Sequence, residues 1–419
     1  MAISRVITRP RIVIVACIAA AAAFVLADQH EGGHGHSALT DLAASRPPVS
    51  SATPVNGSSP IPPRSVPSPT ATSPASTHPS RPTPRQHSSS RGTAGAAPTI
   101  QPSRAGSAPP RSVTPTPVAG GGPFGRPLYN DITSRNDWPA YQRATDPTQK
   151  NLLYQLAGTP LATWLGPSAD AGSVNRVTSA ADARGQTPIF VTYAIPHRDC
   201  GGLSAGGLQT AAQYRSWVDG VRAGIAGRPA VVIIEPDAMG YGCLPPAEKT
   251  ERIAELKYAV NAFAGDVNTY SYIHAGAAGI NPGDMARALK LIDIQKIRGF
   301  ALNVSGYDAT SSELAYGKAL DKALGRTMHF VIDTSRNGVG RNPSNASCNP
   351  PGRAVGPRPT TRTGSTLVDA FLWLHLAGGS DGQCSAGDPA PGVFMPSYAI
   401  AMVQLALDRG IIARLPTPT

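Results

Sequence analysis

The sequence lacks an apolar run of membrane-spanning length. Its longest such run, residues 12–26, has 15 residues, whereas a membrane-spanning helix needs about 20. Three arginines precede the run, and Val25-Leu26-Ala27 has the small-residue pattern of a signal-peptidase site. These features predict a signal peptide over residues 1–27, and hence a secreted or cell-wall-associated protein. The alternative is an uncleaved leader that anchors the chain in a membrane. A lipoprotein is disfavoured because the apolar run continues well beyond Cys17.

Residues 28–122 contain almost no aromatic or large aliphatic side chains. Pro, Ser, Thr, Ala and Gly dominate this segment, which therefore cannot bury enough apolar surface to offset the entropy of ordering. We predict a disordered linker, extended by its prolines, through which the protein would associate with a cell wall. His30, His34 and His36 have no cysteine or carboxylate cluster beside them, so a solvated tail is favoured over a metal site. No metal or cofactor is predicted.

The charge of the chain does not indicate nucleic-acid binding. The formal net charge is +11, but the leader and linker hold ten basic and only three acidic residues. From residue 123 onward 27 basic and 23 acidic residues remain, a net charge of +4 without a concentrated basic stripe. A nearly neutral folded part suits a neutral substrate better than a nucleic acid.

Only four cysteines follow the leader: Cys200, Cys243, Cys348 and Cys384. An even number in an exported protein predicts two disulfides, for which three pairings exist. The order in the chain favours Cys200 with Cys243 and Cys348 with Cys384. Each of these pairs would join two loops that follow strands.

Residues 123–419 are enough for one α/β barrel domain. Apolar strand-like runs alternate there with helical patterns, which predicts βαβ units and a parallel sheet. The predicted strands are Pro188–Ile195, Ala230–Glu235, Thr269–His274, Gly299–Val304, Met328–Asp333 and Ala370–Leu376. The predicted helices are Leu208–Ala226, Pro246–Phe263, Gly283–Leu291, Ser311–Leu324 and Ser397–Arg409.

Polar residues lie at or just beyond the carboxyl ends of the predicted strands. They are Asp199, Asp237, His274, Asn303, Asp333 and Asp381. In parallel α/β folds this edge of the sheet carries the active site. Each residue alone could be a helix cap or a turn residue, and for Asn303 and Asp333 the two interpretations are equally favoured. Taken together, the six residues predict one site.

Two carboxylates, Glu235 and Asp237, end the buried strand in the stretch VVIIEPDAMG. A charge in this position is costly unless it is paired or used. Several Asp residues without a His and Cys ligand set favour proton transfer, such as the splitting of a glycosidic bond by an acid and a second carboxylate. Asp237 is the candidate acid because Pro236 fixes the backbone before it, and because an apolar setting and a neighbouring Asp199 would raise its pKa.

The chain from about Trp164 to the C-terminus resembles glycoside hydrolase family 6, the inverting endoglucanases and cellobiohydrolases. The matching blocks are Tyr193-Ala-Ile-Pro-His-Arg-Asp-Cys200, Ile234-Glu-Pro-Asp237, Leu302-Asn-Val-Ser305, Ile332-Asp-Thr-Ser-Arg-Asn-Gly338, Cys348-Asn-Pro-Pro-Gly-Arg353 and Ser380-Asp-Gly382. The resemblance implies a distorted, incomplete parallel α/β barrel of about seven strands as a single catalytic domain. It also implies a β-glucan substrate, and we expect a monomer.

The resemblance implies roles for single residues. Asp237 would be the general acid, Asp199 would tune it and help to relay a proton, and Asp381 falls on the proposed position of the base. Tyr193 would crowd the sugar toward a distorted ring, and Trp164 falls on an aromatic position near the family's cleft. The family's disulfides match the pairing that chain order favours. The expected reaction is inverting hydrolysis of internal β-1,4-glucosidic bonds in cellulose or a related β-glucan.

Several positions that normally hold glucose hydroxyls and faces depart from the family pattern. They are His274 for Asp, Ala277 for His, Ile280 for Trp, His375 for Lys and Gly379 for Glu. His274, Asn303 and His375, with Trp164, remain the candidate substrate-binding residues. We interpret His274 as a neutral hydrogen-bonding replacement, and the alternative is a new proton carrier near Asp237.

Two other functions stay open. A catalytically weak or inactive relative that binds glycans is favoured by the five departures and opposed by the retained residues Tyr193, Asp199, Asp237 and Asp381. A serine hydrolase would use Ser204 or Ser380, which both lie in a G-x-S-x-G pattern. That motif needs a strand, a sharp turn and a helix in succession. Neither serine has this setting, so we interpret both as turn residues.

Overall fold

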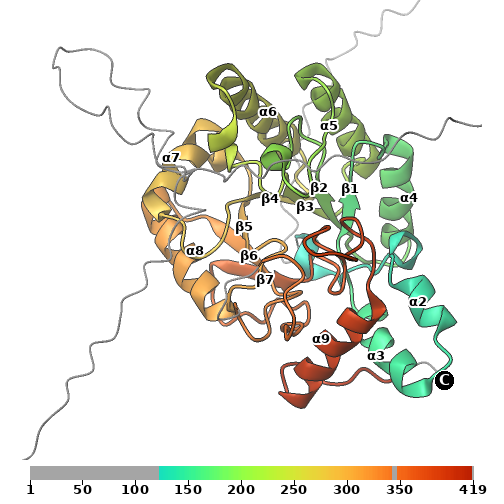
Figure 1. Ribbon diagram of the computed structural model, residues 1–419. Coiled ribbons are helices and arrows are strands. Elements are labelled where there is room, and N and C mark those ends of the chain that lie inside the picture. Colours follow the sequence, from blue (N-terminus) through green and yellow to red (C-terminus); the bar gives the residue numbers. More distant parts are fainter. Residues whose placement is uncertain (1–121, 342–346, 418–419) are drawn as a thin grey trace, which may run out of the picture. The chain divides into compact units, whose positions relative to one another are not determined.

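A sheet of seven parallel strands forms the centre of the computed structural model, which describes residues 122–341 and 347–417 (Figure 1). The strands follow one another across the sheet in chain order, so each pairs with the next. They are β1 (Thr163–Leu165), β2 (Ile189–Thr192), β3 (Ala230–Ile234), β4 (Thr269–His274), β5 (Gly299–Leu302), β6 (His329–Asp333) and β7 (Val368–Leu372). The predicted signal peptide and linker lie outside the described residues, and within these no helix is both long and apolar enough to cross a membrane.

Helices cover the outer face of the curled sheet (Figure 1). They are α4 (Ala171–Asp182), α5 (Ala211–Ile225), α6 (Pro246–Ala264), α7 (Pro282–Leu291) and α8 (Thr310–Leu324). Alternate strand residues point outward to these helices, such as Val232 and Phe300, or inward to a second apolar cluster, such as Val231 and Ala301. Burial on both faces explains why the strands are apolar almost throughout. Three further helices, α2 (Trp138–Arg143), α3 (Pro147–Ala157) and α9 (Pro396–Asp408), lie beside this arrangement.

The two edges of the sheet meet without forming a continuous ladder. β1 and β7 are not paired as strands, but the Ala162 amide donates to the Trp373 carbonyl at 3.1 Å. The Trp164 indole N–H donates to the Leu374 carbonyl at 2.7 Å. The sheet therefore curls into an incomplete barrel, which confirms the predicted fold class.

All six strands predicted from apolar runs are present, although the last begins two residues earlier than predicted. The sequence reasoning missed β1, because a three-residue strand carries almost no periodic signal. It also missed α2, α3 and α4. The five predicted helices are observed within three residues of their predicted ends, helped by prolines at the start of α6, α7 and α9.

Candidate active site

Left-handed backbone conformations are concentrated in the loops at the carboxyl edge of the sheet. Of the ten non-glycine residues with positive φ in the described part, all but Ala226 and Asp293 lie in these loops. The eight are His197, Asp199, Cys200, Glu235, Asp237, Asn303, Ser305 and Asn349. Such conformations cost on the order of 1 kcal/mol or more each, and they persist only where surrounding contacts hold them. The loops are therefore held in shape by specific contacts.

Asp237 follows β3 and reaches the carboxyl edge with its side chain 53% exposed. Its pKa is raised to about 6, mainly because neighbouring protein atoms partly remove the carboxyl group from water and then because of the charge of Asp199. The nearby Tyr193 hydroxyl and the charge of Arg198 lower the pKa of Asp237 by smaller amounts. Since half of the side chain still meets water, a bound sugar that covered it would raise this pKa further. Asp237 is thus able to hold a proton in mildly acidic solution.

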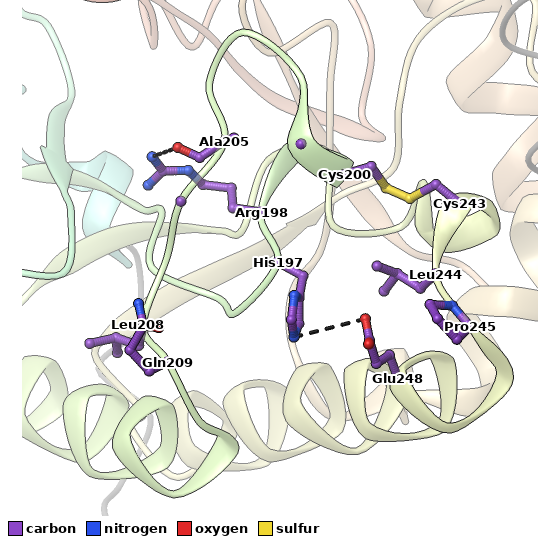
Figure 2. A pocket seen from close by; sticks show the side chains of 12 residues that line it. His197, Arg198, Cys200, Ala205, Leu208, Gln209, Cys243, Leu244, Pro245 and Glu248 are labelled. Atoms are coloured by element: carbon purple, nitrogen blue, oxygen red, sulfur yellow. Dashed lines mark hydrogen bonds and ion pairs between the residues drawn. A yellow bond between two sulfur atoms is a disulfide. The ribbon is translucent and has the colours of Figure 1, made fainter.

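Asp199 lies on a tightly turned loop after β2. Its carboxylate accepts a hydrogen bond from the Ser204 amide at 2.8 Å, and the next residue, Cys200, forms a disulfide with Cys243. Cys243 follows Asp237 by six residues, so this disulfide joins the two carboxylate-bearing loops. Figure 2 shows this loop beside α6, where His197 faces Glu248, with the His197 Nε2 atom 3.8 Å from the carboxylate.

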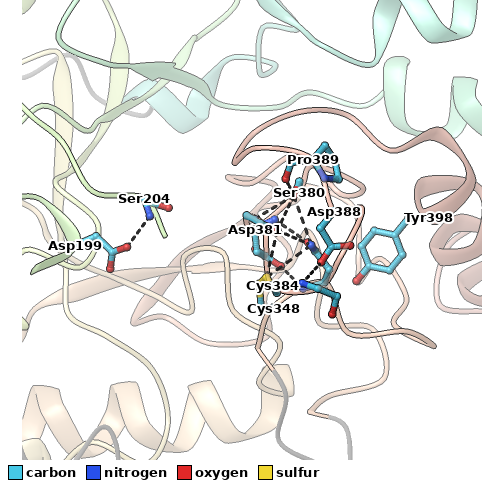
Figure 3. Close-up of a disulfide and its surroundings, with 12 residues drawn as sticks. Asp199, Ser204, Cys348, Ser380, Asp381, Cys384, Asp388, Pro389 and Tyr398 are labelled. Carbon is cyan, nitrogen blue, oxygen red and sulfur yellow. Dashed lines mark hydrogen bonds between the residues drawn. A yellow bond between two sulfur atoms is a disulfide. The ribbon is translucent and has the colours of Figure 1, made fainter. Parts of the chain in front are cut away.

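Asp381 has a different environment. The Arg336 guanidinium donates to its carboxylate at 2.7 Å, and the Asn349 amide donates to it at 2.9 Å. Burial alone would raise the pKa of Asp381, but the charge of Arg336 and these hydrogen bonds hold it below the ordinary value. Asp381 lies beside the disulfide between Cys348 and Cys384, on a different loop from Asp199 (Figure 3). Both disulfides have the pairing that chain order favours.

A series of side-chain contacts runs from Tyr193 to Asp381. The Tyr193 ring packs edge-on against Trp164, with centroids 5.0 Å apart, and Trp164 packs edge-on against His375 at 6.2 Å. The His375 Nδ1 atom lies 2.9 Å from the Ser305 hydroxyl, and Arg336 donates both to the Ser305 carbonyl and to the Asp381 carboxylate. Because these residues come from β1 and from the loops after β2, β5, β6 and β7, the curl of the sheet is what brings them together.

The loop of Asp199 also touches the loop of Asp381 directly. A Cβ atom placed on Gly382 would lie 3.1 Å from the Leu203 Cβ atom. Leu203 belongs to the loop of Asp199, and Gly382 follows Asp381. The loop of Asp199 therefore lies against the loop of Asp381, and the disulfide between Cys200 and Cys243 joins it to the loop of Asp237.

His274 is buried at the end of β4, where its Nδ1 atom accepts a hydrogen bond from the Asp237 amide at 2.9 Å. Because the backbone N–H must be the donor, the ring carries its own proton on Nε2. Burial lowers the pKa of His274 to about 4, so the ring is neutral at higher pH. These observations favour the neutral hydrogen-bonding interpretation over a proton carrier.

We expect His274→Asp to raise activity on β-1,4-glucan and to move the alkaline limb of the pH profile upward. A carboxylate can accept the same hydrogen bond from the Asp237 amide, and its charge would raise the pKa of Asp237. His274→Asn is the matched control, because it keeps an acceptor without the charge and should leave the alkaline limb in place. Rates at a series of pH values test this, and an unchanged or lower rate for His274→Asp would contradict the family alignment at this position.

Asn303 and Asp333 lie in the interior with their polar atoms occupied by loop contacts. Asn303 is 1% exposed, and its amide group donates to the Asp333 carbonyl at 2.9 Å. The Asp333 carboxylate accepts from the amides of Ser305, Ser335 and Leu374, which belong to the loops after β5, β6 and β7. We propose that both residues position loops, and contact between Asn303 and substrate stays a prediction.

His375 lies on the loop after β7, between Trp164 and Ser305. Its Nδ1 atom lies 2.9 Å from the Ser305 hydroxyl, while its buried Nε2 atom has no hydrogen-bond partner in the described structure. Burial and the charge of Arg336 lower the pKa of His375 to about 3. The neutral ring therefore cannot replace the charge of the lysine that the family usually has here.

Ser204 and Ser380 do not have the surroundings of a nucleophile. Ser204 follows a single turn of 3-10 helix, and no helix follows until α5. Ser380 is buried, and its hydroxyl group donates to the Pro389 carbonyl at 2.8 Å and accepts from the Gly382 amide at 3.0 Å. Both serines lie in turns, as interpreted from the sequence.

The sequence reasoning missed the charged residues that support the carboxylates. Arg336 lies in one of the family blocks, but nothing in its sequence context indicated a pair with Asp381. Arg252 and Glu255 are buried on α6 among Leu256, Ala259 and Phe263. A signal was present, because two charged residues occupy positions of the apolar stripe of this helix.

Residues 125–406 match the sequence profile of the glycosyl hydrolases family 6. The chain belongs to this family. It is 40% identical over 301 residues to endoglucanase A of Thermobispora bispora, a match of 68% of this chain and 65% of that protein. It is 42% identical over 263 residues to endoglucanase 1 of Streptomyces halstedii, covering 59% of this chain and 79% of that protein.

The fold of this family 6 member also matches a solved structure. That structure is the endoglucanase Cel6 from Mycobacterium tuberculosis in complex with methyl-cellobiosyl-4-deoxy-4-thio-β-D-cellobioside. The TM-score is 0.64 at 39% sequence identity, and the match covers 68% of this chain and 99% of the other. The family resemblance drawn from the sequence blocks is thereby confirmed.

Proposed function

We propose that the protein hydrolyses internal β-1,4-glucosidic bonds of cellulose or a related β-glucan with inversion. The observation that carries this proposal is that two carboxyl groups of one site have pKa values shifted in opposite directions. The pKa of Asp237 is raised to about 6, and the pKa of Asp381 is held below its ordinary value. Between these values one group is protonated and the other ionised, which is the arrangement that acid and base catalysis of glycoside hydrolysis needs.

In this mechanism Asp237 donates its proton to the glycosidic oxygen as the bond to the anomeric carbon breaks. A water molecule attacks that carbon from the opposite face, and its proton passes to Asp381, directly or through a second water molecule. Asp199 raises the pKa of Asp237 and helps to return a proton to it after each turnover. Tyr193 crowds the sugar ring, and Trp164 offers an aromatic face to a neighbouring sugar.

The choice of substrate is supported by the relatives, which are named endoglucanases. The ligand in the Mycobacterium tuberculosis structure is a thio-linked cello-oligosaccharide derivative. Export is supported by the two disulfides, which persist in oxidising compartments. We propose a secreted, monomeric enzyme whose N-terminal segment associates it with the cell wall.

The wild-type protein is expected to release reducing sugar from carboxymethylcellulose and from mixed-linkage β-glucan. Activity should fall as pH rises through about 6, because Asp237 loses its proton. It should also fall in strong acid, as Asp381 becomes protonated below its ordinary pKa. Proton NMR during hydrolysis of a cello-oligosaccharide should show the α-anomer first, since the β bond is inverted. Initial formation of the β-anomer would contradict inversion.

A second candidate function is glycan binding with little turnover. Two positions favour it, because each lacks the charged residue that the family usually has there. His274 stands in place of Asp and accepts a hydrogen bond from the Asp237 backbone, and His375 stands in place of Lys and is neutral. Retention of the protein by insoluble cellulose, with no sugar release that depends on Asp237, would establish this function instead.

A further inference from the structure

A buried polar cluster lies directly beneath the loops of Asp199 and Asp237. Its members are Glu235 at the end of β3 and Arg252 and Glu255 on α6, and we call it the brace cluster. All three residues are at most 2% exposed. Burying three ionisable groups is costly unless each is compensated. The contacts that compensate these three buried groups therefore indicate what the cluster does for the loops above it.

Arg252 joins the two carboxylate-bearing loops through their backbone carbonyl groups. Its guanidinium donates to the carbonyls of Pro196 and of His197, the latter at 3.0 Å, just before Asp199. It also donates to the carbonyl of Ala238 at 3.2 Å, just after Asp237. The fork of one guanidinium thus holds both loops from below.

Glu235 makes the complementary contacts. Its carboxylate accepts from the amides of Ala194 and Ile195, at 3.1 and 3.2 Å, where β2 leads into the loop of Asp199. Glu235 itself has a left-handed backbone, as do His197, Asp199 and Asp237. Arg252 therefore pairs with carbonyl groups of the two loops, and Glu235 pairs with amide groups. Without the brace cluster these buried backbone groups would lack hydrogen-bond partners.

The ion pair between Arg252 and Glu255 is weaker than these carbonyl contacts. The closest atoms are 3.8 Å apart, and the Nε atom of Arg252 and the Oε1 atom of Glu255 have no hydrogen-bond partner among the described residues. Burial raises the pKa of Glu255 to about 7 despite the nearby cation. The arrangement favours the loop carbonyls over the carboxylate as the main partners of Arg252.

We propose that Arg252 is a positioning residue that fixes the separation of Asp199 and Asp237. This proposal rests on the proposed function, in which Asp199 holds the proton on Asp237. The guanidinium suits the task because its planar fork donates in several fixed directions at once, whereas an ammonium group cannot reach carbonyls of two loops in this geometry. The disulfide between Cys200 and Cys243 limits how far the loops can separate, and Arg252 sets their relative position within that limit.

Arg252→Lys keeps the charge and removes the fork, so it tests position separately from charge. With cello-oligosaccharide substrate we expect kcat to fall about 10-fold or more with little change in KM, because misplacement affects the reacting groups. The alkaline limb of the pH profile should move to lower pH, since Asp199 would raise the pKa of Asp237 less. The other groups that face Asp237 are Tyr193, Arg198 and His274, and all remain in this variant.

A double-mutant cycle with Asp199→Asn makes the test specific. If Arg252 acts by placing Asp199, then Asp199→Asn should lower kcat much less in the Arg252→Lys background than in the wild type. The matched control is Arg135→Lys, which alters another buried arginine that donates to backbone carbonyls, those of Leu156 and Thr159, outside the loops of Asp199 and Asp237. It should lower the melting temperature and leave the alkaline limb unchanged.

Arg252→Gln is the second variant in case Arg252→Lys does not fold. Its single amide group cannot donate to the carbonyls of both loops at once, so it should shift the alkaline limb in the same direction. An alkaline limb that stays at the wild-type pH in a folded Arg252→Lys or Arg252→Gln protein overturns the positioning role. A wild-type protein whose sugar release does not depend on Asp237 would overturn the proposed function itself, which is a different result.

Discussion

Asp237→Asn is expected to lower kcat on β-1,4-glucan by about 10²- to 10⁴-fold, the usual contribution of a general acid. The asparagine has nearly the same shape as the protonated carboxyl group, so the fold and substrate binding should change little. Its amide cannot transfer a proton to the leaving oxygen. The decisive measurement compares cellotetraose with a cellobioside that carries 2,4-dinitrophenolate, a leaving group that needs no proton.

On the activated substrate the loss caused by Asp237→Asn should be much smaller than on cellotetraose. Asp219→Asn is the control, since Asp219 is exposed on α5 and its carboxylate accepts a hydrogen bond from the Tyr258 hydroxyl. An equal loss on both substrates would show that Asp237 does not protonate the leaving group. Unchanged activity on cellotetraose would remove it from the mechanism.

The sheet could be predicted from the sequence because its strands are buried on both faces. Runs such as VVII before Glu235 have one stable location in a water-soluble protein, and two of the helices between the strands, α6 and α7, begin at a proline. What the sequence could not provide was the closure of the barrel. That depends on β1, which has three residues, and on single hydrogen bonds such as that from Trp164 to the Leu374 carbonyl. These contacts join segments about 210 residues apart and leave no local pattern.

The carboxylates of the site could also be predicted, because polar residues at the ends of parallel strands meet at one edge. Their electrostatic partners could not. Arg336 approaches Asp381 only after the loops that follow β6 and β7 have folded together, and Arg252 reaches the loops of two other strands from a helix. Glu235 and Asp237 show that two acidic residues close together in the sequence can have different surroundings. The Glu235 carboxylate is buried and accepts hydrogen bonds from backbone amides, whereas the Asp237 side chain is half exposed.

Arg336→Met should cause the largest loss of stability among the substitutions that affect the site. Arg336 is 2% exposed and paired with Asp381, and it also stacks over the Tyr307 ring at 4.3 Å. Removing one partner of a buried ion pair leaves the other uncompensated and costs about 3–5 kcal/mol. A fall of about 5–10 °C in the melting temperature follows for a domain of this size.

The same substitution should move the acid limb of the pH profile upward by about 1–3 units, because burial would then raise the pKa of Asp381 without an opposing cation. In the wild type the pKa of Asp381 is depressed. The stability that the ion pair contributes is therefore fully present at pH values above the ordinary pKa of an aspartate. It is lost as pH falls through the depressed value. The difference in melting temperature between wild type and Arg336→Met should therefore shrink in strong acid.

Arg135→Met provides the matched control, since Arg135 is a buried arginine paired with Asp137 at 2.7 Å, in the segment before β1. It should lower the melting temperature by a similar amount and leave the acid limb in place. If Arg336→Met instead left the acid limb at the wild-type pH while activity persisted, then the ionisation of Asp381 would not control the rate. The base would have to be sought among other groups of the site.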